Sequence, residues 1–140
     1  NKMLQYIPKN HINKTIDKDL AIDQIKSRLP KEVFKKNTIK SMLYFFRDII
    51  LVYLTYTWFK NSNLPRIVKI PLHAFIQGTL GWSLFAIAHD CGHGGFSKHK
   101  ILNYIVGLIA NTPDFIPYYP WRLTHKNHHA NTGDLYHDEV

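Results

Sequence analysis

The chain changes character near residue 40, where a polar segment gives way to long apolar runs. Before that point, apolar residues recur at helical spacing only over residues 18–30, at Leu20, Ile22, Ile25 and Leu29. This spacing predicts a short amphipathic helix that ends at Pro30. Residues 1–17 show no such period, and we expect a polar tail there. The pattern therefore divides the chain into a water-facing segment, residues 1–40, and an apolar domain, residues 41–140.

Two apolar runs in the second part are long enough to cross a membrane. The first, residues 41–59, would form a helix of roughly 28 Å at about 1.5 Å per residue, close to the thickness of a bilayer's hydrocarbon core. Arg47 and Asp48 interrupt it, and we expect them near the interface or paired with another helix. A turn at residues 61–65 leads to the second run, residues 67–88. These runs predict a hairpin of two transmembrane helices.

A third apolar run, residues 101–110, is too short to cross, because Asn111 and Pro113 interrupt it. It predicts an interfacial or re-entrant helix. An aromatic and basic group of the kind that anchors at a lipid interface follows it, namely Tyr118, Tyr119, Trp121 and Arg122. The predicted fold is thus an all-α integral membrane protein with two transmembrane helices and one interfacial or re-entrant helix.

The excess of Lys and Arg is better explained by residues that mark the cytoplasmic side of a membrane than by nucleic-acid binding. The formal net charge is +8, but no zinc-finger spacing or interleaving of basic and aromatic residues on a compact fold accompanies it. Several cations precede the first apolar run, as in cytoplasmic segments: Lys26, Arg28, Lys31, Lys35, Lys36 and Lys40. Because a hairpin returns the chain to its starting side, the amino-terminal segment and the residues after the second run are both expected on the cytosolic side.

Two histidine clusters follow the second apolar run. The first is His89-Asp-Cys-Gly-His93, and the second is His125-Lys-Asn-His128-His129. Residues three and four apart share one face of a helix, so each cluster can direct its imidazoles to one point. Five imidazoles exceed the need of one tetrahedral zinc site and favour a site for two metal ions. The predicted metal ligands are His89, His93, His125, His128 and His129.

Other residues near the clusters are less favoured as functional residues. Cys91 is a possible soft ligand, although a small apolar helix residue is the favoured interpretation. Carboxylates beside the clusters are equally well explained as acceptors for metal-bound imidazoles or as solvated charges: Asp90, Asp134, Asp138 and Glu139. His73 and Gln77 could line a polar path, but an interhelical hydrogen bond is favoured. His11, His99 and His137 are interpreted as ordinary polar residues.

A zinc metalloprotease is a poor alternative. The first cluster has the histidine spacing of the HExxH motif, but Asp90 replaces the glutamate that serves as general base. A zinc protease would also give the second cluster no role.

The two clusters and their neighbours resemble the histidine boxes of membrane fatty acid desaturases. Residues 89–97, HDCGHGGFS, resemble the first box, and residues 125–133, HKNHHANTG, resemble the second. The resemblance continues upstream through residues 29–34 and 40–44 and downstream through residues 138–140. The first box is most similar to those of methyl-end enzymes, and its HDCGHG form is closer to the omega-3 type than to the delta-12 type.

This resemblance implies a diiron centre held by histidines of three boxes, including His89, His93, His125, His128 and His129. It also implies molecular oxygen as oxidant, a fatty acyl lipid as substrate, and cytochrome b5 or ferredoxin as electron donor. The expected reaction introduces a cis double bond into the acyl chain, and the expected location is the endoplasmic reticulum membrane. A third box is absent from the 140 residues, so we expect an amino-terminal fragment that is inactive by itself.

Alternatives to a desaturase remain open from the sequence. Related acyl hydroxylases and acetylenases share the boxes, and a noncatalytic membrane module could bind metal through exposed histidines. Regioselectivity, acyl carrier, chain length and oligomeric state are not determined by these motifs.

Overall fold

The computed structural model describes residues 24–138, and every element of regular structure in that range is helical. The chain divides into two compact units, residues 1–35 and 36–140. In the first unit, residues 24–28 are helical, and the short 3-10 helix η2 (Lys31–Phe34) follows Pro30. The predicted amphipathic helix is thus confirmed where it approaches Pro30. Its earlier part, like the predicted polar tail, lies outside the described residues.

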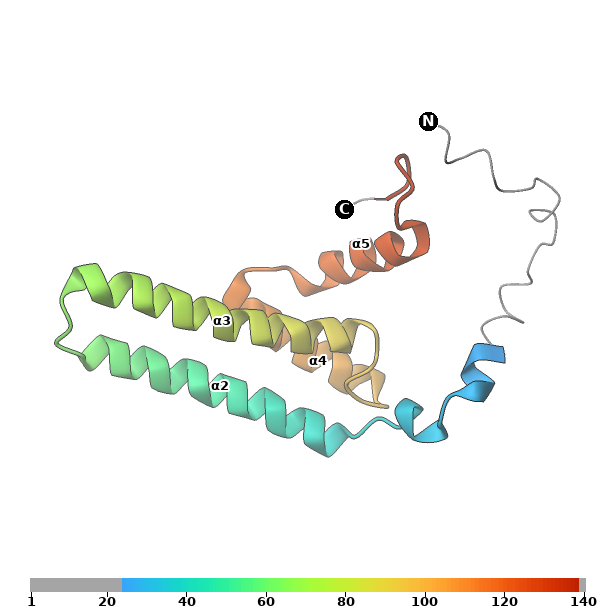
Figure 1. The fold of residues 1–140 in the computed structure, drawn as a ribbon, viewed down its shortest axis with the longest axis horizontal. Coiled ribbons are helices and arrows are strands. Elements are labelled where there is room, and N and C mark those ends of the chain that lie inside the picture. The colour runs from blue at the N-terminus through green and yellow to red at the C-terminus, as the bar shows by residue number, and fades with distance from the viewer. Residues whose placement is uncertain (1–23, 139–140) are drawn as a thin grey trace, which may run out of the picture. The chain divides into compact units, whose positions relative to one another are not determined.

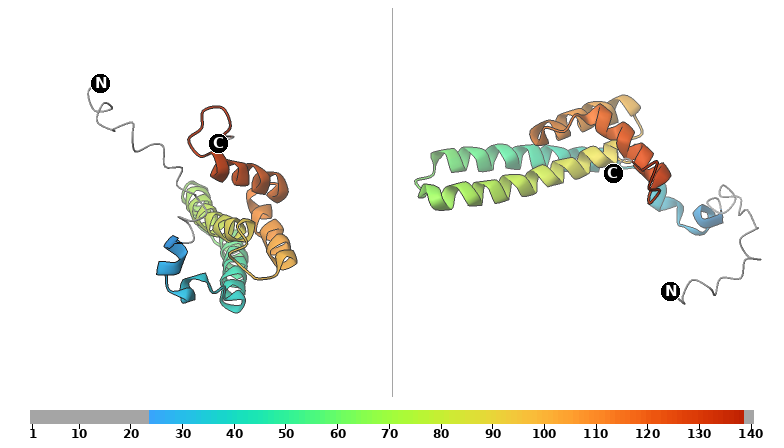
Figure 2. Two further views of the ribbon diagram at one scale, coloured as in Figure 1. Left: turned by 90° about the vertical axis from the view of Figure 1, so that its right-hand side faces the viewer. Right: turned by 90° about the horizontal axis from the view of Figure 1, so that it is seen from above.

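The second unit is built on a hairpin of two long helices, α2 (Thr38–Asn61) and α3 (Arg66–Gly92). The two helices lie antiparallel and side by side (Figures 1 and 2). The α2 helix begins at a favourable cap, because Asn37 Oδ1 accepts a hydrogen bond from the Lys40 backbone N–H at 3.0 Å. Residues 62–65 form the connection. The hairpin was predicted from the two apolar runs, and both helices extend beyond the predicted bounds.

Membrane-crossing character is clearest for α3. Within residues 24–138, it is the one helix that is both long and apolar enough to cross a membrane. The α2 helix has 24 residues, so its length suffices, but it does not meet the same test of apolarity.

Polar contacts join the two helices of the hairpin. Gln77 Nε2 donates to Val52 O at 3.2 Å and to Thr55 Oγ1 at 2.9 Å, which confirms the predicted interhelical hydrogen bond for Gln77. For His73 it is not formed through Nε2, which is buried and has no hydrogen-bond partner among the described residues. Ser83 Oγ donates to Asp48 Oδ2 at 2.6 Å, and the Asp48 side chain also pairs with its neighbour Arg47. Asp48 is only 1% exposed, so the expected pairing with another helix is formed in the interior of the hairpin.

Two shorter helices cover one end of the hairpin. The α4 helix (Lys100–Asn111) packs on α3, and its 12 residues make it roughly 18 Å long, too short to cross a bilayer. A short 3-10 helix, η3 (Thr112–Asp114), then leads to α5 (Tyr118–Asn131). A methyl group at Gly107 of α4 would overlap the Tyr118 ring, so glycine permits this close approach of α5.

The core lies at the end of the hairpin where α4 and α5 pack. All four helices contribute buried apolar residues to one cluster: Phe45, Leu84, Ala88, Cys91, Phe96, Val106, Ala110 and Tyr118. The rest of the hairpin exposes large apolar side chains, with Phe59 as its buried apolar exception. The ordered core is therefore concentrated at the end of α3 that carries the first histidine cluster.

Candidate metal centre

The end of α3 and the middle of α5 bring four imidazoles together. His89 lies in the last turns of α3, and His93 is the residue that caps this helix. His125 and His129 lie one turn apart on α5. One ring nitrogen from each of the four lies within 4.8 Å of the others. The predicted convergence of the two clusters is thus present for four of the five histidines.

His125 is the central member of this group. Its Nε2 lies 3.2 Å from His93 Nε2 and 3.1 Å from His129 Nε2. Two nitrogens bound tetrahedrally to one ion at about 2.1 Å would lie roughly 3.4 Å apart, so these separations fit a shared metal ion. An all-imidazole donor set suits iron, zinc or copper rather than calcium or magnesium. The residues present therefore fit a transition metal.

The surroundings of the group favour neutral imidazoles. Burial, followed by the neighbouring His89 and His129 rings, lowers the pKa of His93 below its usual value. Burial and the other imidazoles also lower the pKa of His125. Neutral imidazole is the form that binds metal, so both rings are prepared for ligation at neutral pH.

His128 does not join the four. Its Nδ1 lies 2.8 Å from Asp138 Oδ1, and its ring centroid is 5.6 Å from that of His129. The contact with Asp138 leaves Nε2 of His128 as the ring nitrogen that could bind a metal. Ligation by His128 stays a prediction. Of the two explanations left open for the carboxylates, Asp138 follows the one in which a carboxylate contacts a histidine of the second cluster.

The other carboxylates differ from Asp138. Asp90 Oδ1 lies 3.9 Å from His89 Nδ1, which is too long for a hydrogen bond. Asp134 Oδ2 lies 3.0 Å from Nδ1 of His137, which is not one of the predicted ligands. Glu139 lies outside the described residues. Of the four carboxylates considered, Asp138 is therefore the one in place to orient a predicted ligand.

The remaining candidate residues lie apart from the centre. Cys91 is buried in the core and is not a member of the metal-binding group, as its favoured interpretation predicted. His73 lies between aromatic rings, with its centroid 4.8 Å from that of Phe59. His99 caps α4. His11 lies outside the described residues.

Trp121 belongs to the site, although its sequence context predicted a residue at the lipid interface. Its ring stacks on that of His125, with centroids 4.9 Å apart and an interplanar angle of 15°. The residue was expected to anchor at a lipid interface together with Tyr118, but Tyr118 is only 1% exposed, so that expectation was wrong for Tyr118. The four-residue spacing between Trp121 and His125 was the available signal, because it places both rings on one face of α5.

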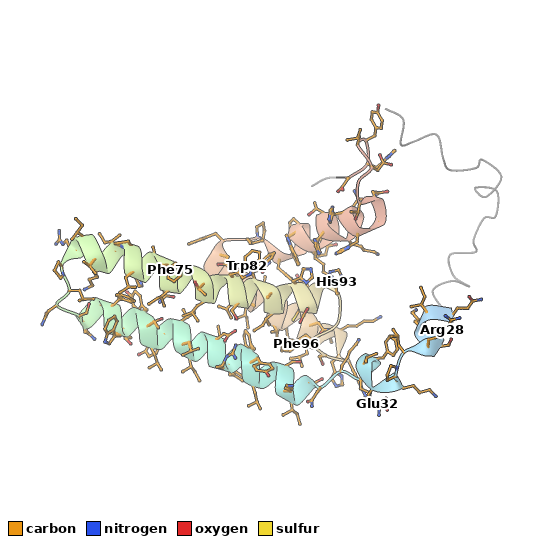
Figure 3. The ribbon with its side chains drawn as sticks, viewed as in Figure 1. Arg28, Glu32, Phe75, Trp82, His93 and Phe96 are labelled. Carbon is orange, nitrogen blue, oxygen red and sulfur yellow. The ribbon has the colours of Figure 1, made fainter. Side chains whose placement is uncertain are left out.

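A hollow of about 460 Å³ adjoins the imidazoles. His93, His125 and His129 line it together with Trp121 and other residues of α5. Figure 3 shows His93 on the side of α3 that faces α5. Three of the four imidazoles are therefore accessible from one side, and a ligand or a further part of the protein could reach them.

Comparisons with known proteins find a family model that covers both histidine clusters of this centre. The fatty acid desaturase family model matches residues 68–140, which include both histidine clusters. The chain is 42% identical over 119 residues to an sn-1 acyl-lipid omega-3 desaturase (ferredoxin) of Nostoc sp., covering 85% of this chain and 33% of that protein. No solved structure matches the chain.

Plant relatives extend the comparison. An endoplasmic reticulum omega-3 fatty acid desaturase of Nicotiana tabacum is 39% identical over 116 residues, which cover 83% of this chain and 30% of the relative. A delta-12 fatty acid desaturase of Calendula officinalis is 32% identical over 131 residues, or 89% of this chain and 34% of the relative. The chain thus spans about a third of the length of these relatives. The match of the family model across both clusters shows that the chain belongs to the fatty acid desaturase family.

Proposed function

We propose that the chain is the histidine-bearing membrane part of a diiron fatty acyl desaturase that introduces a cis double bond toward the methyl end of an unsaturated acyl chain. The single observation that supports this most strongly is the convergence of His89, His93, His125 and His129 within 4.8 Å at the end of an apolar helix. The relatives named above are acyl-lipid or fatty acid desaturases, which makes an acyl lipid the proposed substrate.

In this proposal two iron ions are held by the four converging imidazoles and by His128, with further ligands from a third histidine box. The bound irons would supply the activation of molecular oxygen that removes two hydrogens from the acyl chain. Asp138 contacts Nδ1 of His128, and this contact would leave Nε2 as the nitrogen that holds the metal. Trp121 supports the plane of the His125 ring by stacking on it. These contacts fix ligand orientation rather than transfer protons to the substrate.

The proposed topology has α2 and α3 both crossing the membrane. Large apolar residues are exposed along α2, and a helix that is apolar on most sides is typical of a membrane or a large core. The hairpin would place the histidines on the same side as the lysine-rich residues before α2. In the endoplasmic reticulum that side is the cytosol.

Omega-3 rather than delta-12 selectivity is the preferred assignment. The omega-3 relatives are 37–42% identical to this chain, whereas the delta-12 relative is 32% identical. The proposed electron donor is ferredoxin or cytochrome b5. Ferredoxin stands in the name of the Nostoc relative, and the donor for this chain would follow the membrane in which it resides.

The test is expression of the full-length reading frame in yeast with linoleate and oleate fed separately. Gas chromatography should detect new alpha-linolenate from linoleate. New linoleate from oleate would assign delta-12 selectivity instead. A protein that is inserted in the membrane, is supplied with ferredoxin or cytochrome b5 and its reductase, and forms neither product would contradict the proposed activity.

A further inference from the structure

A second hollow, of about 400 Å³, lies where α3 ends and α4 begins. Its lining contains no carboxylate but four cationic side chains, namely Lys36, Lys98, Lys100 and Arg122. We infer that this hollow binds the phosphate headgroup of an anionic membrane lipid. The inference concerns a lipid-binding site beside the metal centre and does not require that the bound lipid be the one that is desaturated.

The four cations are not neutralised by their neighbours. None of them forms an ion pair with a residue in the described range 24–138. Arg122 Nε makes one long hydrogen bond to Gly92 O, at 3.4 Å, which leaves the rest of its guanidinium available. Like charges around one concavity repel one another and raise the local positive potential. An anion in the hollow would relieve this repulsion and gain attraction from several cations at once.

Backbone N–H groups beside the hollow add hydrogen-bond donors to a lining that already carries these cations. The α4 helix begins at Lys100, and His99, the residue before it, makes no capping hydrogen bond with its side chain. The first backbone N–H groups of a helix lack intrahelical partners and carry partial positive charge, which favours anions such as phosphate. Lys98 and Lys100 flank this helix start and line the hollow. The helix terminus and the lysines therefore attract a ligand of the same sign at the same place.

Asn103 adds a further unsatisfied group to the lining. It is 7% exposed, and its Nδ2 donates to Ser97 O at 3.0 Å. This contact fixes the orientation of the amide, and Oδ1 has no hydrogen-bond partner among the described residues. A hydroxyl on the headgroup, as in a phosphoglycerol, would supply the missing donor. The lining thus combines cations for a phosphate with an acceptor for a hydroxyl.

The position of the hollow favours a lipid over other anionic ligands. Gly92, His93 and Gly94 line it at the end of α3, the helix that is apolar and long enough to cross a membrane. Lipid headgroups lie at the ends of such helices, and anionic headgroups attract clustered lysines there. A protein partner would instead bury roughly 800 Å² on each side, more surface than a small hollow offers. The inference rests on the proposed membrane crossing of α3, but not on the proposed chemistry.

The test compares two short-chain lipids that differ only in the headgroup. The full-length protein in dodecyl maltoside would be titrated with dihexanoyl phosphatidylglycerol and, separately, with dihexanoylglycerol, and binding would be followed by native mass spectrometry. We expect phosphatidylglycerol to bind at least tenfold more tightly. Replacing two lysines, Lys98→Gln with Lys100→Gln, should weaken its binding about 25-fold, because each lysine near an anionic headgroup contributes roughly fivefold.

The matched control removes two lysines elsewhere, Lys31→Gln with Lys60→Gln, and should retain the wild-type preference. Equal binding of the two lipids, or equal loss in both double variants, would overturn the inference. Displacement by inorganic phosphate at the same concentration would show that free phosphate, not a lipid, is the ligand. Loss of ferredoxin binding in the Lys98 and Lys100 variant, with lipid binding unchanged, would reassign the hollow to an acidic protein.

Failure of this inference is distinguishable from failure of the proposed function. A protein that inserts through α3 and forms alpha-linolenate, but shows no headgroup preference, contradicts only the lipid site. A protein that prefers phosphatidylglycerol but forms no desaturated product contradicts only the proposed chemistry. Glycosylation tags that place both ends of α3 on one side of the membrane would contradict both the lipid site and the proposed topology.

Discussion

The first histidine cluster is carried by a helix that packs in the core, whereas the second is carried by a helix with few buried contacts. Leu84, Ala88 and Cys91 of α3 are all buried beside His89 and His93. On α5, Tyr118 is the one buried residue, and it lies at the start of the helix. The predicted ligands on α3 are thus fixed by the fold, while those on α5 would depend more on a bound metal and on the contacts of Tyr118 and Trp121.

The largest effect is expected from removing the imidazole that joins the two clusters. His125 Nε2 lies close to ring nitrogens of both His93 and His129, so His125→Ala should abolish high-affinity metal binding by full-length protein. Metal content after purification, measured by plasma mass spectrometry, would check this. The control His99→Ala removes a histidine outside the group and should retain metal. Full metal content in both variants would contradict the proposed centre.

Metal removal should loosen α5 far more than α3. Metal at a hundredfold excess over its dissociation constant stabilises the bound state by about 2.7 kcal/mol, and α5 has little other packing to replace this. Chelation of the full-length protein should therefore accelerate amide hydrogen exchange over residues 121–131 by about a hundredfold. Residues 80–88 of α3 serve as the internal control and should change little. Equal acceleration of both helices would show that the two clusters do not differ in this way.

Gly107→Ala tests the packing that holds the start of α5. The added methyl group would overlap the Tyr118 ring, and overpacking of this kind typically costs about 2 kcal/mol. Thermal unfolding of the full-length protein should show this loss, together with faster exchange in α5. Gly78→Ala is the matched control, because its methyl group would meet nothing within 4 Å. An unchanged stability for Gly107→Ala would mean that α5 is not seated through Tyr118.

The smallest effect is expected from a carboxylate behind one ligand. Asp138→Asn weakens the acceptor that orients His128 and should reduce metal affinity about tenfold, in the range typical of such contacts. Metal titration in competition with a chelator would measure it. Asp134→Asn is the control, because Asp134 contacts His137 instead. Equal effects of the two substitutions would argue against ligation by His128.

Helices α2, α3 and α4 were predictable because their apolar runs are long and end at clear polar breaks, whereas α5 has no such run. The predicted residues 67–88 fall within α3 (Arg66–Gly92), and residues 101–110 fall within α4 (Lys100–Asn111). The polar residues inside the hairpin were harder to place. Asp48 is buried because Ser83 lies opposite it on α3, and the pairing of two helices depends on their register rather than on either sequence run.

The convergence of four predicted ligands could be expected from the histidine spacing, but the rotation of α5 that leaves out His128 could not. The spacing of His125 and His129 places them on one face of α5, and the structure brings both to the α3 histidines. His128 shares that spacing with His125 only approximately, since residues three apart on a helix differ by about 60° around its axis. The rotation of α5 about its axis decides whether His128 faces α3 or Asp138. That rotation depends on how Tyr118 packs in the core, which no local sequence pattern specifies.

The hydrogen bonds from Gln77 fix the register of α3 against α2. In the proposed membrane-spanning hairpin, no water could replace Val52 O or Thr55 Oγ1 as acceptor, so sliding α3 by one turn along α2 would leave the Gln77 amide without a hydrogen-bond acceptor. His89 follows Gln77 by 12 residues, or roughly 18 Å of helix. A side chain that touches no predicted ligand thereby sets the position along α2 at which α3 presents its imidazoles.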